Sequence, residues 1–270
     1  MGSLANCKLT IFKNWAIKRF IAKYDVDLKE AQITDPKQFI NFNSFFTRLL
    51  EPGKRPIIAD ANTIACPVDG QISQYGNITQ GQIIQAKGIN FSVEQLLADT
   101  QLQWTPSFMD GQFITLYLSP KDYHRVHMPL TGKLLSIIHV PGKLFSVNPK
   151  NAAYIPQLFA RNERVVCIFS CEQGFMALIL VGAIIVASIE TIWTGTVTPS
   201  SPHLGLNHWN YQDSQDNSLL LIKGAEMGHF KLGSTVIALF SHTNFQWAPT
   251  VSADQHVKLG QLLAIINKPI

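Results

Sequence analysis

The chain has 270 residues and a mass of 30.1 kDa, enough for one large domain or two small ones with a substantial core. Hydrophobic residues make up 46% of it and charged residues only 15%, which is an apolar composition for a protein in bulk water. The net charge is +4 and no basic stripe with interleaved aromatic residues is present, so we expect no nucleic-acid partner.

Cysteine usage and hydropathy narrow the class of protein further. The four cysteines form no C-x-x-C pair and lack a matching set of histidines, so we expect free thiols, no zinc site and a reducing compartment. The start of the chain lacks the apolar segment and cleavage site of a signal peptide, which favours the cytoplasm. The longest apolar stretch, 175–189, is shorter than the ~20 residues of a membrane span, so we expect two buried strands there.

A basic segment at 8–24 is predicted to form a helix. Its cations are Lys8, Lys13, Lys18, Arg19 and Lys23. At about 100° per residue its apolar side chains fall into two stripes, one with Ile11, Trp15 and Ala22 and the other with Ile17, Phe20, Ile21 and Tyr24. Two interpretations stay open: the helix packs on its own domain, or it lies on an anionic membrane.

A second helix is expected to begin at Asp35, because an N-cap residue is followed there by a proline suited to the first helical position. Its apolar face has helical spacing and consists of Phe39, Phe42, Phe46 and Leu49. We expect this helix to end before the Pro52-Gly53 pair. A face of this kind normally belongs to a core, and a wall that faces lipid is the alternative.

From residue 56 onward the pattern changes to short strands separated by turn residues. The expected strands are 57–58, 71–74, 83–86, 113–118, 133–139, 165–169, 177–181, 184–190, 219–222, 236–240 and 262–266. A short helix at 92–97 with Ser92 as its N-cap and a long polar surface loop at 199–218 interrupt them. The fold class is therefore α+β and mostly β, with N-terminal helices over 1–55 before a barrel-like or sandwich-like core over 56–270. If the second interpretation of the basic helix holds, 1–55 is a membrane-associating segment, and we expect the catalytic residues in 56–270.

Four residues offer nucleophilic chemistry. Ser234 follows Gly233 directly before an apolar strand, Asp69 lies in a P-V-D-G turn, and His124 and His127 lie in Y-H-R-V-H-M-P. Together they contain a serine, a general base and an orienting carboxylate. Prolines on both sides of the histidine pair favour an extended segment, in which residues three apart point to opposite faces. We therefore expect two separate roles for the histidines rather than one shared metal.

Three functions are compatible with these residues. In the first, the Ser234 hydroxyl attacks the Gly233 carbonyl, an N→O acyl shift forms an ester, and elimination and hydrolysis leave a pyruvoyl group. The second is a Ser-His-Asp hydrolase of lipids or esters with an intact Ser234, although no G-x-S-x-G motif is present. The third is a non-catalytic lipid-binding module in which the Gly-Ser pair is only a turn.

The chain resembles the bacterial phosphatidylserine decarboxylase family over nearly its whole length. The motifs that carry the resemblance are YDVDLKEAQ, FNSFFTRLLEPGKRPI, PVDGQIS, QAKGINFS, YLSPKDYHRVHMP, VPGKLFSVN, LFARNERVVCIF, VGAIIVASIETIWTGTVTP and GAEMGHFKLGSTVIALF. The similarity weakens in the 199–218 loop and after residue 241. The resemblance favours the first of the three functions.

The resemblance implies self-cleavage between Gly233 and Ser234, with Ser234 becoming a pyruvoyl cofactor that forms a Schiff base with the amine of phosphatidylserine. It assigns the self-cleavage chemistry to Asp69 and His127 and the decarboxylation step to His124. Neither pyridoxal phosphate nor a metal is implied. The product is phosphatidylethanolamine.

The resemblance also implies how the processed protein is organised. Subunits 1–233 and 234–270 stay associated, and the second contains 37 residues (270 − 233). A homodimer of this heterodimer is compatible with the resemblance. The expected location is peripheral, on the cytoplasmic face of the inner membrane.

Overall fold

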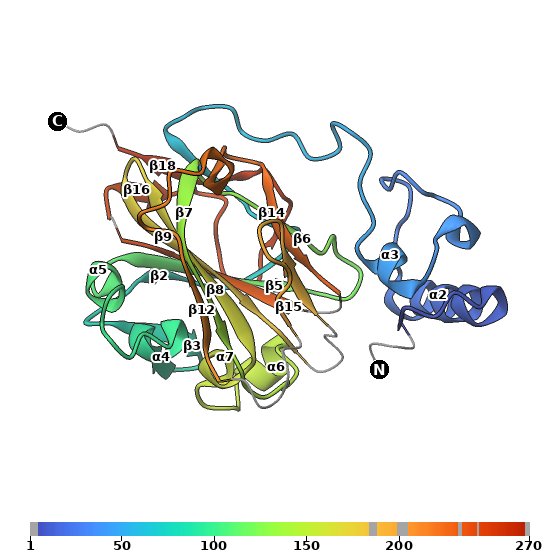
Figure 1. The fold of residues 1–270 in the computed structure, drawn as a ribbon, viewed down its shortest axis with the longest axis horizontal. Helices are drawn as coiled ribbons and strands as arrows, with labels where there is room; N and C mark the ends of the chain where they lie inside the picture. Colours follow the sequence, from blue (N-terminus) through green and yellow to red (C-terminus); the bar gives the residue numbers. More distant parts are fainter. Residues whose placement is uncertain (1–4, 184–187, 199–204, 232–233, 242, 268–270) are drawn as a thin grey trace.

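The computed structural model describes residues 5–183, 188–198, 205–231, 234–241 and 243–267. The helices at the start of the chain form a unit at one end of the molecule, beside the edge of a strand-rich core that carries β6 and β14 (Figure 1). This N-terminal unit buries an apolar cluster of its own, made of Ile17, Val26, Leu28, Ala31, Phe39, Phe45 and Phe46.

The first predicted helix is confirmed as α2 (Thr10–Tyr24). Its two apolar stripes have different surroundings. Ile17 is fully buried, and Phe20 packs edge-on against phenylalanines of the same unit. Ile11 and Trp15, on the other stripe, are 89% and 59% exposed. The packed stripe thus attaches α2 to its own unit and leaves the second stripe on the surface.

The second helix prediction was wrong in its extent. Asp35 does cap a helical turn, η1 (Pro36–Gln38), but the chain then becomes extended before α3 (Phe42–Phe46). The reason is a second N-terminal signal: Asn41 and Ser44 exchange side chain to backbone hydrogen bonds in a capping box. This capping box starts a new helix where one continuous helix was expected.

The predicted strand-rich core is confirmed, and the strand pairings in the four sheets that the described residues form are antiparallel. The largest sheet has the order β12-β7-β8-β9-β15-β5-β2-β17, with β13 beside β7. Its strands are β2 (Gly70–Asn77), β5 (Gln112–Leu118), β7 (Gly132–Val140), β8 (Arg164–Cys171), β9 (Gly174–Val181), β12 (Asn207–Asn210), β13 (Leu220–Leu221), β15 (Ser234–Phe240) and β17 (His256–Val257).

Three smaller sheets complete the core in the part of the chain that the structure describes. Their orders are β11-β10-β14-β6, β1-β18-β16 and β3-β4. Their strands are β1 (Thr63–Ala65), β3 (Gln82–Ala86), β4 (Ile89–Ser92), β6 (Arg125–His127), β10 (Ile189–Thr191), β11 (Gly195–Thr196), β14 (Glu226–Phe230), β16 (Phe245–Trp247) and β18 (Leu262–Ile266). Most of the long apolar runs that the sequence marked as strands lie in the largest sheet.

Two local predictions needed correction. Residues 57–58 are not a strand, although the Ile58 amide donates to the Gly260 carbonyl oxygen. The loop expected at 199–218 contains strand β12, which pairs with β7 at the edge of the largest sheet. The sequence did not indicate this strand because an edge strand needs an apolar face on one side only, and β12 has no apolar run. Two parts of these predictions lie outside the described residues. They are residues 199–204 of the expected loop and residues 184–187 of the strand expected at 184–190.

Short helices lie between the strands. They are α4 (Val93–Leu97), α5 (Thr105–Phe108), α6 (Pro149–Ala152), α7 (Leu158–Arg161) and η2 (Asn217–Leu219). Ser92 caps α4 as predicted, since its hydroxyl accepts from the Gln95 amide. Within the described ranges, no helix combines the length and the apolar character that crossing a bilayer requires.

Candidate active site

Ser234 is the first residue of β15, in the interior of the largest sheet. It pairs with Leu118, the last residue of β5. Its side chain is fully buried, and its Oγ has no hydrogen-bond partner among the residues that the structure describes. Buried hydroxyls are normally satisfied, but the Thr115 and Thr235 hydroxyls of the same sheet also lack a described partner, so Ser234 is a candidate because its free Oγ follows the Gly233 carbonyl directly in the chain.

Asp69 lies at the same end of the sheet as Ser234. It precedes the first residue of β2, and β2 pairs with β5, which in turn pairs with β15. The contact between β2 and β5 is close at Gly70, where a Cβ atom would lie 2.5 Å from the Tyr117 carbonyl oxygen. Asp69 is thus about two strand spacings, or ~10 Å, from Ser234.

The Asp69 carboxylate is held by fixed partners. Arg55 donates from Nε to Oδ1 at 2.8 Å and from Nη2 to Oδ2 at 2.6 Å, and the Leu259 amide donates to Oδ1 at 2.8 Å. Arg55 also pairs with Glu30 at 2.8 Å. Burial opposes the charge of Arg55, but its hydrogen bonds to Asp69 and Glu30 raise the pKa of the guanidinium above its ordinary value.

His127 ends strand β6 and lies beside the turn that contains Asp69, because its amide donates to the Pro67 carbonyl oxygen at 2.9 Å. Its Nδ1 donates to the Gly224 carbonyl oxygen at 2.8 Å, which leaves a lone pair on Nε2. That Nε2 is buried and has no partner in the described part of the chain. Burial lowers the pKa of His127, so the imidazole is neutral at pH 7.

The structure therefore brings Asp69 and His127 close together without joining them. Arg55 and the Leu259 amide occupy the carboxylate, and the Gly224 carbonyl occupies Nδ1 of the imidazole. The orienting hydrogen bond of a hydrolase triad, from His Nδ1 to a carboxylate, is not made between these two residues. Asp69 still acts on His127 through its charge, which raises the pKa of the imidazole against the larger effect of burial.

His124 precedes β6 and has different surroundings from His127. Its ring is fully buried and lies 4.1 Å from the ring of Phe46 in α3. Its Nδ1 donates to the Asp122 carbonyl oxygen at 2.9 Å, and its Nε2 has no partner among the described residues. Burial lowers the pKa of His124 to about 3, so this imidazole too carries a free lone pair on Nε2.

A chain of charges that the sequence did not reveal leads to the segment before Ser234. Arg125 donates from Nη1 to both carboxylate oxygens of Glu226 at 2.8 Å, and His229 lies between Glu226 and Glu190, 3.4 and 3.0 Å from them. Glu190 also pairs with Lys231, three residues before Ser234. These groups come from β6, β10, β14 and the residue that follows β14, so only the fold brings them together.

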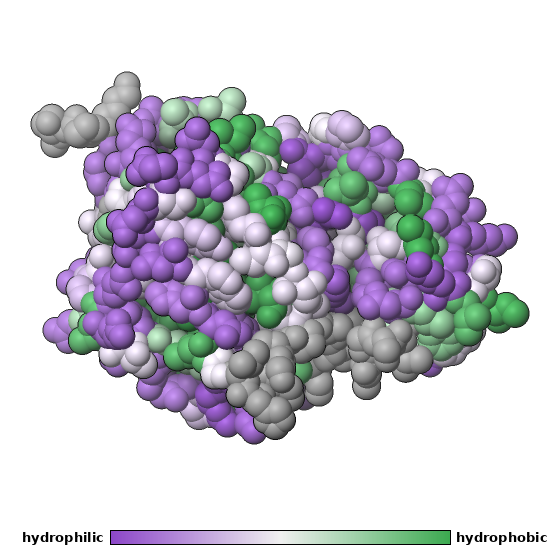
Figure 2. Space-filling view, in the orientation of Figure 1, coloured by the Kyte–Doolittle hydropathy of each residue, from purple (hydrophilic) through white to green (hydrophobic). Residues whose placement is uncertain are grey.

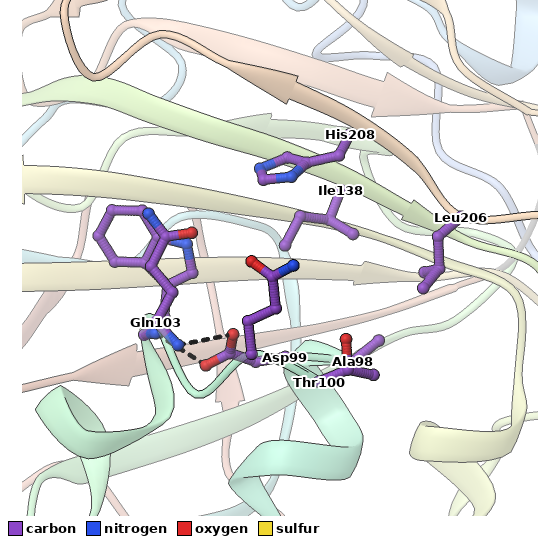
Figure 3. A pocket seen from close by; sticks show the side chains of 9 residues that line it. Ala98, Asp99, Thr100, Gln103, Ile138, Leu206 and His208 are labelled. Atoms are coloured by element: carbon purple, nitrogen blue, oxygen red, sulfur yellow. Dashed lines mark hydrogen bonds between the residues drawn. The ribbon is translucent and has the colours of Figure 1, made fainter.

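A separate pocket of about 150 Å³ lies between the 98–104 turn and β12. Figure 3 shows that the Asp99 carboxylate is turned back onto its own loop, where it accepts hydrogen bonds from the Gln103, Trp104 and Thr105 amides. His208, on its rim, is bonded through Nε2 to Ser136. This pocket contains none of the predicted site residues. Across the described ranges, no group of three or more His, Cys, Asp or Glu side chains is placed to hold a metal.

Ser234 begins a strand of one antiparallel sheet, and His124 and His127 lie at a strand of a second, so the two sheets supply the residue types that a serine-dependent enzyme uses. The sequence model of the phosphatidylserine decarboxylase family matches residues 42–265. The chain is 50% identical to the phosphatidylserine decarboxylase proenzyme of Bordetella petrii over 98% of its own length and 91% of that protein. It is similarly related to the proenzymes of Pseudomonas putida strain GB-1, at 50% identity, and Ectopseudomonas mendocina, at 51%, each match covering 97% of this chain and 91% of the relative. The chain belongs to the phosphatidylserine decarboxylase family.

Proposed function

We propose that this chain cleaves itself between Gly233 and Ser234 and that the processed enzyme decarboxylates phosphatidylserine to phosphatidylethanolamine. Membership of the family, whose curated relatives are named proenzymes, supports both parts. The structural observation that carries the proposal is the buried Ser234 hydroxyl without a described partner at the start of β15.

Self-cleavage needs a base beside Ser234, and His127 suits this role. Its Nε2 lone pair can take the hydroxyl proton while Oγ attacks the Gly233 carbonyl carbon. The Gly233–Ser234 C–N bond then breaks and leaves an ester on Oγ and a free amine on Ser234. Removal of the Ser234 Cα proton expels the Gly233 carboxylate, and water releases ammonia from the resulting dehydroalanine. The ketone that remains is a pyruvoyl group.

The surroundings of Ser234 fit this group. Its side chain is enclosed in an apolar sheet and its Oγ has no described competing partner, so the position accepts a carbonyl in place of the hydroxyl. The pyruvoyl group supplies the electron sink that the loss of CO2 from an amino acid requires. No pyridoxal phosphate or metal is needed for that purpose.

His124 suits the proton transfer of the decarboxylation step. Because burial keeps it neutral, its Nε2 can accept a proton from the ammonium of the serine headgroup. It can return this proton to the carbon that has lost CO2. The His124 ring contacts Phe46, so this chemistry takes place in an apolar setting that excludes water.

The N-terminal unit is proposed to place the enzyme on the membrane that holds its substrate. The division at residues 1–55 and 56–270 is supported by the separate apolar cluster of the first part. Exposed apolar side chains lie on α2 together with Lys18, Arg19 and Lys23, and Figure 2 shows apolar surface at the α2 end of the molecule. Such a face fits an anionic bilayer surface.

The proposed assembly has two subunits from one chain, 1–233 and 234–270. The whole of β15 belongs to the small subunit, between β9 and β5 of the large one. These two pairings would keep the subunits together after cleavage. A homodimer of this unit and a peripheral position on the cytoplasmic face of the inner membrane complete the proposal.

The experiment that tests the function compares two reagents on purified protein. With phosphatidylserine in mixed micelles, the enzyme is expected to release CO2 and form phosphatidylethanolamine. A fluorophosphonate probe, which labels activated serines of hydrolases, is expected to leave the processed enzyme unlabelled. Labelled Ser234 in an intact chain that hydrolyses lipid esters would instead establish the hydrolase.

A further inference from the structure

Arg48, which follows α3, is a buried cation with incomplete pairing. Its side chain is 5% exposed. Nη2 donates to the Lys121 carbonyl oxygen at 2.7 Å and weakly to that of Asp122 at 3.4 Å. Nε and Nη1 are buried and have no hydrogen-bond partner among the described residues. None of the ion pairs within the described ranges includes Arg48.

A comparison with one other buried arginine and two half-buried ones shows that this is unusual. Arg164 is equally buried and has no acidic partner in the described part, but its three nitrogens donate to four backbone carbonyl oxygens. Arg55 and Arg125 each pair with carboxylates. The Arg48 guanidinium also lies over the Phe45 ring, 5.8 Å from its centroid, but this contact leaves Nε and Nη1 without an acceptor among the described residues. Since an unpaired buried charge is unfavourable, these two nitrogens are suited to bind an anion.

The free guanidinium nitrogens lie next to the candidate proton-transfer residue. The Asp122 carbonyl oxygen accepts from both Arg48 Nη2 and His124 Nδ1. The charge of Arg48 also contributes, after burial, to lowering the pKa of His124. The unpaired cation and the unpaired imidazole Nε2 therefore share one small region at the contact between α3 and the loop before β6.

We propose that Arg48 binds the phosphodiester of the phosphatidylserine headgroup through its Nε and Nη1. This inference rests on the proposed function, because it assigns a role toward that substrate. A guanidinium fork matches two phosphate oxygens in one plane. Both atoms are unexposed, so binding requires α3 and the loop before β6 to move apart.

The headgroup contains a second anion, the carboxylate that leaves as CO2, but this group is a poor choice for Arg48. An ion pair with it would stabilise the reactant more than the transition state, in which the negative charge moves away from the carboxylate. The phosphodiester keeps its charge throughout the reaction. A cation on the phosphodiester holds substrate and product without opposing the chemistry.

The test measures binding in the uncleaved Ser234→Ala chain, which forms no pyruvoyl group. Glycerophosphoethanolamine carries the phosphodiester without the carboxylate, and free L-serine carries the carboxylate without the phosphodiester. Adding Arg48→Gln is expected to weaken glycerophosphoethanolamine binding about 10- to 100-fold in a calorimetric titration and to leave L-serine binding unchanged. Arg48→Lys, which keeps the charge but loses the fork, is expected to give an intermediate loss.

Controls separate this proposal from misfolding and from the proposed function itself. Lys121→Gln removes one charge from an exposed side chain of the same loop and should leave both titrations unchanged. In the cleavable chain, Arg48→Gln should still process itself, which shows that it folds, and should raise the KM for phosphatidylserine with little change in kcat.

Three results of the titrations would overturn the proposal. They are equal affinity for glycerophosphoethanolamine with and without Arg48→Gln, no measurable binding by either chain, and a loss confined to L-serine. A wild-type enzyme that fails to decarboxylate phosphatidylserine would overturn the function instead.

Discussion

Burial determines the protonation state of both candidate histidines. It lowers the pKa of His127, and it lowers that of His124 from an ordinary 6.5 to about 3. In each ring Nδ1 donates to a backbone carbonyl oxygen, so the free lone pair is on Nε2. Both residues therefore begin as proton acceptors, which self-cleavage and decarboxylation each require of their base.

The buried state of His124 predicts a pH dependence of stability. Unfolding restores the ordinary pKa, so between pH 6.5 and about 3 the unfolded chain binds more protons than the folded one. The free energy of unfolding that depends on neutral His124 is fully present above pH 6.5, and it is lost as the pH falls toward 3. At pH 5 the loss amounts to about 2 kcal/mol of the free energy of unfolding. Urea titrations of the uncleaved Ser234→Ala chain at pH 7.5 and pH 5 measure it.

Carboxylates also titrate near pH 5, so the comparison needs a second variant. His124→Gln in the same background keeps a polar side chain at this position but removes the imidazole, the group that would bind the proton. Its free energy of unfolding should fall less between the two pH values than that of the chain with His124. Equal losses in the two chains would show that His124 is not held neutral by the fold.

The ion pair of Arg55 with Asp69 predicts that Arg55 positions the carboxylate for self-cleavage. Arg55→Gln leaves a buried carboxylate with the Leu259 amide as its one remaining described partner, and breaking a buried pair in this way costs about 3 kcal/mol. Self-cleavage should slow at least about tenfold in a gel time course, since Asp69 is no longer held beside His127. Lys54→Gln, an exposed neighbour, should process at the normal rate.

At this scale the sequence points to candidate residues but not to the partners that the structure gives them. Ser234, Asp69 and the two histidines were selected because they lie in short motifs with known chemistry. The partners of Arg48 and Arg55 were not predictable, because they come from segments 14 or more positions away. Their only signal was their presence as basic residues in the FNSFFTRLLEPGKRPI motif.

Among the secondary-structure elements, the paired strands β14 and β10 leave no room for a side chain at Gly228. A Cβ atom on Gly228 would lie 2.3 Å from the Glu190 carbonyl oxygen, whereas one on Gly205 would meet nothing within 4 Å. Gly228→Ala should therefore lower the free energy of unfolding by about 1–3 kcal/mol and slow cleavage, because β14 leads to Ser234. Gly205→Ala should change neither quantity. An unaffected Gly228→Ala chain would show that this sheet does not position the cleavage segment.

The elements that the sequence predicted correctly are those with long apolar runs. Strands such as β5, β9 and β15 are buried on both faces and stand out in the sequence. Short strands such as β6, β12 and β14 contain histidines and polar residues, and they form because neighbouring strands offer backbone partners. The division of the second helix depended on the Asn41–Ser44 capping box, which outweighed a continuous apolar pattern.

At the scale of the whole molecule, α2 shows why the two interpretations of the basic segment need not exclude each other. One stripe of the helix packs into the N-terminal cluster, and the other is exposed. An exposed apolar stripe next to cations is the pattern of a helix that lies in a membrane interface. The unit is therefore proposed to fold on its own core and to bind lipid with its outer side.

This two-sided helix predicts a specific loss of vesicle binding. Replacing Ile11 and Trp15 together with serine should weaken binding to vesicles that contain anionic lipid by about tenfold or more, since these side chains would be buried in the interface. Ile84→Ser removes an exposed apolar side chain from β3 instead and should have no effect. Co-sedimentation measures both. Undiminished binding of the double variant would place the membrane contact elsewhere.

The most direct test of the whole account is the intact mass of the purified, active enzyme. We predict two polypeptides, 1–233 and 234–270, the smaller one lighter by one ammonia molecule than a peptide that begins with serine. Ser234→Ala should give one uncleaved, inactive chain. Active enzyme that consists only of the intact 270-residue chain would contradict the account.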